Sequence, residues 1–202
     1  IMFVSLSDTL DEGDDNATSG EKVTIAISSV VNDNATATGT AQTVTIIDND
    51  SQPGVTLSVP LLVLDEVTGT TTVTVNLNTA SGLPVTVVLA KTGTAFDGVD
   101  YSLGTSTLVV SAGATSAQTI LTILDDTLNE VLGGELIIID IDTVCNGTET
   151  GNQVKTITIT DNDPIPAVNL SVGSPTIAES GVTATTTVRA TLNVPASGLP
   201  VT

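Results

Sequence analysis

The sequence contains no tryptophan and no histidine, a single cysteine (Cys145), and only 1% aromatic residues. With one cysteine, no disulfide can form within this stretch of chain. Zinc and copper sites are disfavoured as well, because their ligands are mainly imidazole nitrogen and thiolate sulfur. Any folded core must therefore be aliphatic, built from many Val, Ile and Leu side chains rather than from a few large rings.

Positive charge is also scarce. Four Lys and Arg stand against 23 Asp and Glu, which gives a formal net charge of −19. Nucleic acids and anionic membrane surfaces are bound through clustered cations, so we expect no nucleic-acid partner. The sequence has no apolar run of about 18 residues, so we expect no direct membrane insertion in this segment.

An internal repeat is the main feature that the sequence does contain. The string TVTIIDNDSQP at 43–53 recurs as TITITDNDPIP at 156–166, and VTLSV at 55–59 recurs as VNLSV at 168–172. Both matches are offset by 113 residues. A unit of about 110 residues is an ordinary domain size, so the repeat predicts tandem domains.

Two shorter matches complete the alignment. SGLPVT occurs at Ser81 and Ser197, and SDTLDE at Ser7 has the counterpart DDTLNE at Asp125. The predicted domains are the C-terminal part of a first repeat (1–53), a complete repeat (54–163) and the N-terminal part of a third (164–202). We expect a window of a longer array, so a missing signal peptide or anchor carries no information. Strand exchange between chains is the alternative if the sequence ends are natural.

In the complete repeat, apolar and polar residues alternate with the period of a β-strand. TVTVNLN places Val73, Val75 and Leu77 on one face and Thr and Asn on the other. Gly, Pro, Ser and Asn turns separate seven such segments: 55–59, 72–78, 84–90, 107–110, 117–124, 135–141 and 155–160. The pattern predicts an all-β fold, with seven-stranded immunoglobulin-like Greek-key sandwiches in tandem.

Acidic residues are concentrated in alternate loops of this predicted sandwich. If successive strands alternate in direction, every second loop falls at the same pole. One pole then collects Glu66, Asp97, Asp100, Asp125, Asp126, Glu130, Glu135, Asp161 and Asp163. Each like-charge pair about 4 Å apart costs on the order of 1 to 4 kcal/mol, and a hard divalent cation removes that cost. Calcium takes six to eight oxygen ligands, so the pattern predicts a calcium site.

Neither general surface acidity nor catalysis accounts for the pattern as well as a metal does. General acidity should decorate the outward strand faces, where Thr is the commonest residue. Ser19 to Lys22 fits S-x-x-K, but that motif needs a helix beside a pocket. Asp125 and Asp126 are adjacent, whereas a glycosidase acid and base act across a gap of roughly 5 to 9 Å. We therefore expect no enzyme activity and no catalytic residue.

The order of the motifs resembles a known family. The strings DEVTGTTTVTVNL, PVTVVLAKTGTAFDGVDY, TLVVSAGATSAQTILTILDDTLNE and TITITDND follow one another through the complete repeat. This sequence is similar to the Calx-β domain, whose members are seven-stranded sandwiches that can hold calcium ions at one pole. Members occur in the regulatory loop of sodium–calcium exchangers, in an integrin subunit, and in tandem within bacterial surface and adhesion proteins.

The resemblance also implies which residues bind calcium. In the complete repeat the implied ligands are Glu66, Asp100, Asp125, Asp126, Glu130, Asp161 and Asp163, with a backbone carbonyl near Leu128. In the partial repeats they are Asp8, Glu12, Asp48, Asp50 and Glu179. Three positions depart from the family pattern. Asn162 stands where calcium-sensing members have a third carboxylate, and Ser7 replaces the first acid of the Asp-Asp pair. Glu135, the second Glu of the loop that begins at Asp125, is displaced by two residues from the usual spacing. Fewer charges predict an affinity of roughly 10⁻⁴ to 10⁻³ M, or a little tighter.

Three functions follow as hypotheses. The first is a non-enzymatic calcium-binding repeat of an extracellular adhesin or surface filament, in which calcium stiffens the joints between domains. Its partners would be neighbouring repeats of the same chain or filament, with protein or glycan surfaces as further candidates. The second is a calcium-sensing regulatory domain of a membrane transporter. The third is a structural fibre subunit without functional metal sites.

Overall fold

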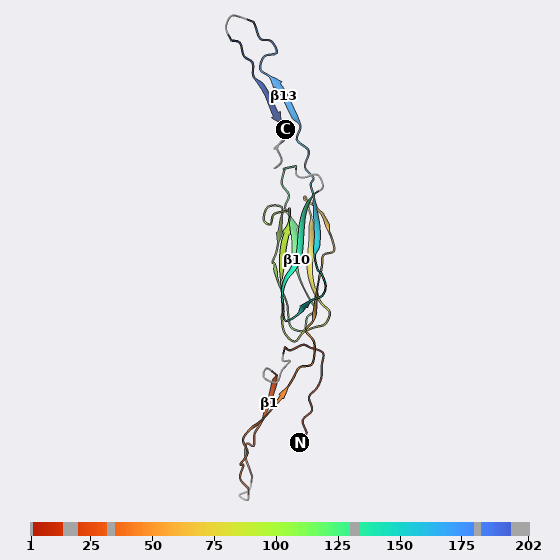
Figure 1. Cartoon of the computed structure of the whole chain (residues 1–202), viewed down its shortest axis with the longest axis vertical. Helices are drawn as coiled ribbons and strands as arrows, with labels where there is room; N and C mark the ends of the chain where they lie inside the picture. The colour runs from red at the N-terminus through yellow and green to blue at the C-terminus, as the bar shows by residue number, and fades with distance from the viewer. Residues whose placement is uncertain (1, 14–19, 32–34, 130–133, 180–182, 195–202) are drawn as a thin grey trace.

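The computed structural model describes residues 2–13, 20–31, 35–129, 134–179 and 183–194. Within these residues the chain forms strands and no helix. The described part accordingly contains no helix with the length and apolar character needed to cross a membrane. The molecule is elongated, with a β-sandwich in the middle and a two-stranded hairpin on either side of it (Figure 1).

The sandwich consists of two five-stranded sheets. In spatial order the first sheet comprises β4 (Val63–Asp65), β12 (Lys155–Thr160), β10 (Glu135–Cys145), β6 (Val85–Gly93) and β8 (Thr107–Val110). The second comprises β11 (Thr148–Glu149), β3 (Gly54–Ser58), β5 (Thr70–Leu77), β9 (Ser116–Ile123) and β7 (Tyr101–Leu103). The prediction of an all-β sandwich is confirmed.

The core between the two sheets is mainly aliphatic, as the composition predicts, with Tyr101 buried in the same cluster. Val73 and Val75 of β5 are fully buried, and so are Leu121 of β9, Ile137 of β10 and Ile157 of β12. Burying each such side chain contributes on the order of 1.5 to 3 kcal/mol relative to leaving it exposed. The alternation in the sequence thus determines which face of each strand packs against the opposite sheet.

All seven predicted segments are strands, and the structure adds three short ones: β4, β7 and β11. The sequence pattern predicts an antiparallel sandwich, but two of the short strands pair in parallel, β4 with β12 and β11 with β3. Pro60 lies between β3 and β4. Because proline has no N–H to donate, it ends the pairing of β3 within its sheet. The chain then resumes as an edge strand of the opposite sheet.

The two hairpins lie in the segments that the sequence assigns to partial repeats. β1 (Glu21–Ile25) pairs with β2 (Gln42–Ile46), and β13 (Val168–Val172) pairs with β14 (Val188–Leu192). In the repeat alignment β1 and β2 correspond to β10 and β12, and β13 and β14 to β3 and β5. Their apolar side chains are largely exposed. The division into three repeats stays a prediction.

Candidate metal centre

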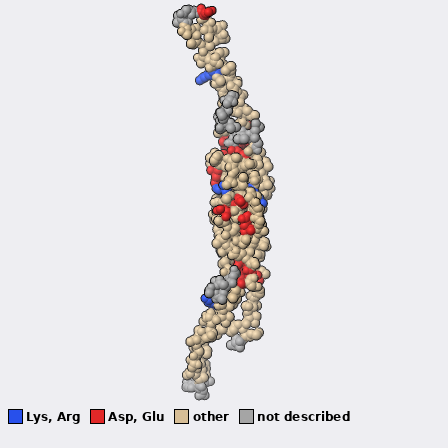
Figure 2. Space-filling model, viewed as in Figure 1, with Lys and Arg blue, Asp and Glu red and all other residues tan. Residues whose placement is uncertain are grey.

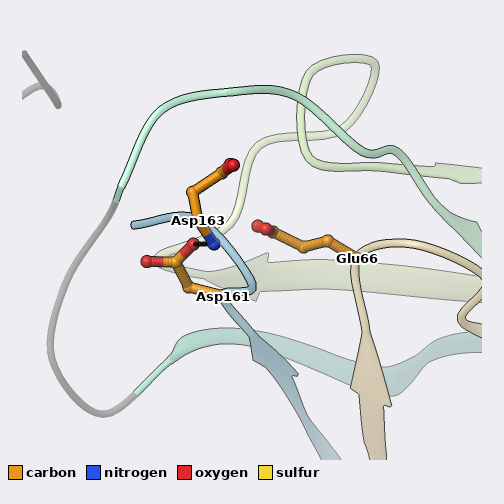
Figure 3. A group of neighbouring side chains, drawn as sticks. All are labelled: Glu66, Asp161 and Asp163. Atoms are coloured by element: carbon orange, nitrogen blue, oxygen red, sulfur yellow. Dashed lines mark hydrogen bonds between the residues drawn. The ribbon is translucent and has the colours of Figure 1, made fainter. Parts of the chain in front are cut away.

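Two neighbouring strands deliver the central acidic residues to one end of the sandwich. β4 and β12 are parallel, and Asp65 of β4 is aligned with Thr160 of β12. Glu66 and Asp161 are the next residues of the two strands, so the parallel register places them side by side. Asp163 follows two residues later, and one carboxylate oxygen from each of the three acids lies within 4.8 Å of the others (Figure 3).

Backbone hydrogen bonds shape the Asp161–Asp163 turn. The N–H of Asp163 donates to Oδ1 of Asp161 at 2.8 Å, and the N–H of Asn162 donates to Oε2 of Glu66 at 3.4 Å. Within the described structure, Oδ2 of Asp163 is hidden from solvent and accepts no hydrogen bond. Desolvation, and then the charges of Asp161, Asp126 and Asp125, raise the pKa of Asp163. Oδ2 of Asp163 is therefore a buried carboxylate oxygen within a group of acidic side chains.

The loop after β9 is hydrogen-bonded to the turn after β12. Asp125 Oδ1 accepts a hydrogen bond from Nδ2 of Asn162 at 3.3 Å, and Asp126 Oδ1 accepts one from the N–H of Leu128 at 2.7 Å. The bond to Asn162 places Asp125 at the same pole as Asp161, and the charges of Asp125 and Asp126 both act on Asp163 there. Glu130, the remaining predicted ligand of this loop, lies outside the described residues.

Asn129 is a site residue that is absent from the predicted set. Its Nδ2 donates to Oδ2 of Asp161 at 2.8 Å and to the backbone oxygen of Asp163 at 3.0 Å. The amide therefore links the loop after β9 to the turn after β12. The repeat alignment held a signal for it, because Asn129 corresponds to Asp11, and a short polar side chain occupies this position in both copies.

Asp100 lies beside the cluster without joining the three close carboxylates. It is 8% exposed, and its Oδ2 accepts a hydrogen bond from the N–H of Phe96 at 2.5 Å. Its backbone oxygen accepts from the N–H of Leu124 at 2.9 Å, which places it next to the start of the Asp125 loop. The neighbouring Asp97 is instead paired with Lys91. Of these two acids, Asp100 is the one positioned near the site.

A second acidic site lies in the first segment. Asp8, Glu12, Asp48 and Asp50, the predicted ligands of that segment, line one cavity of about 40 Å³. Oδ2 of Asp48 accepts a hydrogen bond from the N–H of Glu12 at 2.8 Å, and its Oδ1 accepts one from the N–H of Asp50 at 3.0 Å. These N–H groups, Glu12 first, lower the pKa of Asp48. Glu21, absent from the predicted set, also lines the cavity.

Two hydrogen bonds of the central site have equivalents in the first site. Asp50 bonds to Asp48 as Asp163 bonds to Asp161. The N–H of Leu10 donates to Oδ1 of Asp8 at 2.9 Å, which reproduces the contact between Leu128 and Asp126. Each pair of contacts involves residues that the repeat alignment equates. Similar sequences have therefore folded into similar turns at both acidic sites.

Other acids lie apart from these sites. Glu179 is exposed, in the segment that joins β13 to β14 on the side of that hairpin away from the sandwich (Figure 1). Acidic side chains also appear along the middle of the sandwich (Figure 2). Strand β10 carries two acids outside the loops, Asp140 and Asp142. The outward strand faces are therefore not free of acid, although most acids in the described loops of the sandwich are at one pole.

Comparison with known proteins matches part of the sequence to a family. The family model of the Calx-beta domain matches residues 48–163. No curated protein matches the chain. Similar crystal structures include CBD12 from CALX1.2, at 19% identity, covering 55% of this chain and 45% of that one with a TM-score of 0.47. The apo-form Calx CBD1 domain has 19% identity, 56% and 100% coverage, and a TM-score of 0.47.

The calcium binding domain CBD12 of CALX1.1 is similar over 50% of this chain and 41% of that one, with 21% identity and a TM-score of 0.43. This chain thus spans less than half the length of either CBD12 structure. The match to the family model includes both strands that deliver the central acids, β4 and β12, and the loop after β9. It covers more than half of the sequence, and the chain belongs to the Calx-β domain family.

Proposed function

We propose that the chain binds calcium at the pole formed by Glu66, Asp161 and Asp163, with Asp125 and Asp126 supplying further oxygens. The observation that carries this proposal is the convergence of three carboxylate oxygens within 4.8 Å of one another. Calcium–oxygen distances are about 2.3 to 2.6 Å, so two ligands on opposite sides of one ion are about 5 Å apart. All three carboxylates can therefore reach a single ion.

The chemistry of the donor set fits a hard cation. The candidate ligands are carboxylates, and the chain contains no histidine. Its one cysteine, Cys145, is at the end of β10 away from the acidic site. In the described structure, Oδ2 of Asp163 is buried and without a hydrogen-bond donor. A bound cation would supply its missing partner and offset the desolvation and the charge repulsion that raise the pKa of Asp163. These features together favour oxygen coordination of calcium.

The position of the site supports a mechanical role. Asp163 is followed after a short connection by β13, which begins at Val168, so the site adjoins the next hairpin. The first acidic site, at Asp48 and Asp50, likewise lies just before β3. We propose that calcium rigidifies these joints in a non-enzymatic repeat segment of an extracellular adhesin or surface filament. Neighbouring repeats are then the first partners, and protein or glycan surfaces are further ones.

Calcium titration of the whole chain by isothermal calorimetry tests the proposal. We expect binding at roughly 10⁻⁴ to 10⁻³ M, as in extracellular calcium modules. The variants D161N and D163N should bind more weakly, because each replaces a carboxylate by a neutral amide. D142N, on the exposed part of β10, is the matched control and should bind like the parent.

The outcomes separate the alternative functions. Micromolar binding would favour the calcium-sensing regulatory domain of a membrane transporter. No heat of binding at millimolar calcium, with the fold intact by circular dichroism, would favour a structural fibre subunit without functional metal sites. Equal binding by D142N and D163N would place the ions away from the pole described above.

A further inference from the structure

A contact joins the acidic loop of the first segment, residues 7–13, to the loop Ser81–Leu83 between β5 and β6. Ser81 Oγ donates to the backbone oxygen of Asp11 at 3.1 Å, and the N–H of Gly82 donates to the same oxygen at 3.0 Å. Asp11 and Ser81 also form a parallel β-bridge. The Ser81–Leu83 loop is at the end of the sandwich opposite Glu66, so this contact lies at the joint with the first segment.

Both sides of the contact are buried although they are polar loop residues. Asp11 and Ser81 are each 1% exposed. Burying a hydroxyl or a carbonyl costs free energy unless it is hydrogen-bonded, and here the Asp11 carbonyl receives two donors. Ser81 also remains tied to its own sandwich, because its backbone oxygen accepts from the N–H of Gly113 at 2.8 Å. The carbonyl of Asp11 and the hydroxyl and carbonyl of Ser81 are therefore all hydrogen-bonded within this buried contact.

Glycines allow the two loops to approach. A Cβ on Gly82 would lie 2.9 Å from Cγ of Glu12 and 3.3 Å from the backbone oxygen of Asp11. On the facing loop, a Cβ on Gly13 would lie 2.8 Å from Cδ1 of Leu83. Distances near or below 3.0 Å are too short for carbon atoms that are not bonded, so each glycine provides space for the other loop.

One peptide group connects this interface to the first acidic site. The carbonyl of Asp11 accepts from Ser81 and Gly82, and the N–H of the same peptide, that of Glu12, donates to Oδ2 of Asp48 at 2.8 Å. The peptide is planar, so its two ends cannot rotate independently. A shift of Asp48 would therefore be transmitted to the loop of the following sandwich.

The sequence repeats both partners of the contact. The acidic loop SDTLDE recurs as DDTLNE at 125–130, and SGLPVT recurs at 197–202. Each acidic loop is thus followed in the chain by a Ser-Gly-Leu loop about 70 residues later, in the next predicted repeat. The second Ser-Gly-Leu loop lies outside the described residues, so the contact at that joint is predicted from sequence alone.

We propose that the Ser81–Leu83 loop is a docking site for the acidic loop of the preceding repeat, so that neighbouring repeats are joined by a specific interface. The docking itself does not depend on calcium. Its coupling to the acidic site, through the Asp11–Glu12 peptide, rests on the proposed function. Calcium at Asp48 would then act on a contact that already fixes the direction of the next domain.

Double electron–electron resonance on the full chain tests the docking. One spin label is placed on the native, exposed Cys145 and the other on S28C, an exposed position in the first segment. All samples are measured in EDTA, so that bound calcium does not contribute to differences between the parent and its variants. The labelled parent should give a narrow distance distribution. G82V should broaden it, because its side chain would occupy the space of Glu12 and Asp11.

Two further variants make the result decisive. G39V is the matched control, because a Cβ on Gly39 meets nothing within 4 Å, and it should leave the distribution narrow. S81A removes one of the two donors to Asp11 and should also broaden it, which covers the case in which G82V fails to fold. A broad distribution in the parent, or narrow ones in both joint variants, would overturn the proposal. Failure of calcium binding is detected separately by calorimetry and leaves the EDTA result unaffected.

Discussion

Asp163 donates its backbone N–H to the carboxylate of Asp161 at 2.8 Å. This bond closes the turn after β12 and directs both side chains to the end of the sandwich where Glu66 also lies. The equivalent bond, from Asp50 to Asp48 at 3.0 Å, follows β2 in the first segment. The acidic string Asp-Asn-Asp is therefore a structural turn as well as a group of carboxylates, and both roles can be tested.

Removing the Glu66 carboxylate should weaken calcium binding. Glu66 is 5% exposed and lies within 4.8 Å of Asp161 and Asp163. The variant E66Q keeps the shape of the side chain but removes one negative charge from the site. We expect calcium affinity to fall about tenfold or more, since affinity at such sites follows the number of charged ligands. Calorimetry measures the change, and an unchanged affinity would exclude Glu66 as a ligand.

Calcium should raise the thermal stability of the chain. At 10 mM calcium and a dissociation constant of about 1 mM, linkage predicts about 1.4 kcal/mol of stabilisation per site. For a domain of this size that corresponds to an increase in melting temperature of roughly 5 °C. Magnesium should have a smaller effect, because it requires near-octahedral coordination and retains its water. Calorimetric scans at matched ionic strength measure both, and equal shifts would indicate simple charge screening.

The pH dependence of stability should differ between the two sites. The pKa of Asp163 is raised above 3.8, chiefly by desolvation. The folded state therefore binds the Asp163 proton more tightly than the unfolded state does, which stabilises the fold at low pH. This stabilisation is lost as the pH rises through the raised pKa. Without calcium, D163N should be more stable than the parent at neutral pH, and the difference should vanish below pH 3.8. Urea unfolding in EDTA from about pH 3 to 7 measures this, with D142N as the control.

Asp48 should behave in the opposite way. Its pKa is lowered below 3.8, chiefly by the N–H of Glu12. The stabilisation it contributes is therefore present above pH 3.8 and is lost as the pH falls through its folded pKa. Carboxyl NMR titration of the chain in EDTA should place the midpoint of Asp48 below 3.8 and that of Asp163 above it. The reverse order would contradict the hydrogen bonds that lower the pKa of Asp48 and the desolvation that raises the pKa of Asp163.

Asn129 should position Asp161 for binding. Its amide donates to Asp161 and to the backbone of Asp163, so N129A removes both bonds. We expect calcium affinity to fall about 10-fold or more, in the range known for residues that orient metal ligands. N129D places an acid there, as Asp11 does in the first segment, and should lower stability in EDTA. Calorimetry and urea unfolding together distinguish an orienting role from a purely structural one, because a structural role would change stability and leave affinity unchanged.

Much of the fold could be predicted from local patterns. The period-2 alternation around Val73 and Val75 predicts both a strand and its buried face, because the side chains of a strand alternate between its two faces. All seven predicted strands are present, and the core is aliphatic. The strand β4 could not be predicted, because it has only three residues and exists through its pairing with β12.

The candidate site was predictable in location but not in composition. Alternating strand directions place the acidic loops at one pole, and the structure brings Glu66, Asp161 and Asp163 together there. The predicted ligand set as a whole stays a prediction, with Glu130 outside the described residues. Asn129 and Glu21 were missed because one is uncharged and the other begins a strand. The signal for Asn129 was its alignment with Asp11 in the repeat.

Local periodicity and the order of segments were enough to specify the seven longer strands of the sandwich, its mainly aliphatic core, the sequence repeat of about 110 residues and the end of the sandwich where acid accumulates. They could not specify which acids come within 4.8 Å of one another or which loop contacts Asp11. Those contacts depend on the pairing of β4 with β12 and on the packing of the loop 7–13 against the loop Ser81–Leu83. Residues that lie 70 or more positions apart in the chain meet only through such long-range packing.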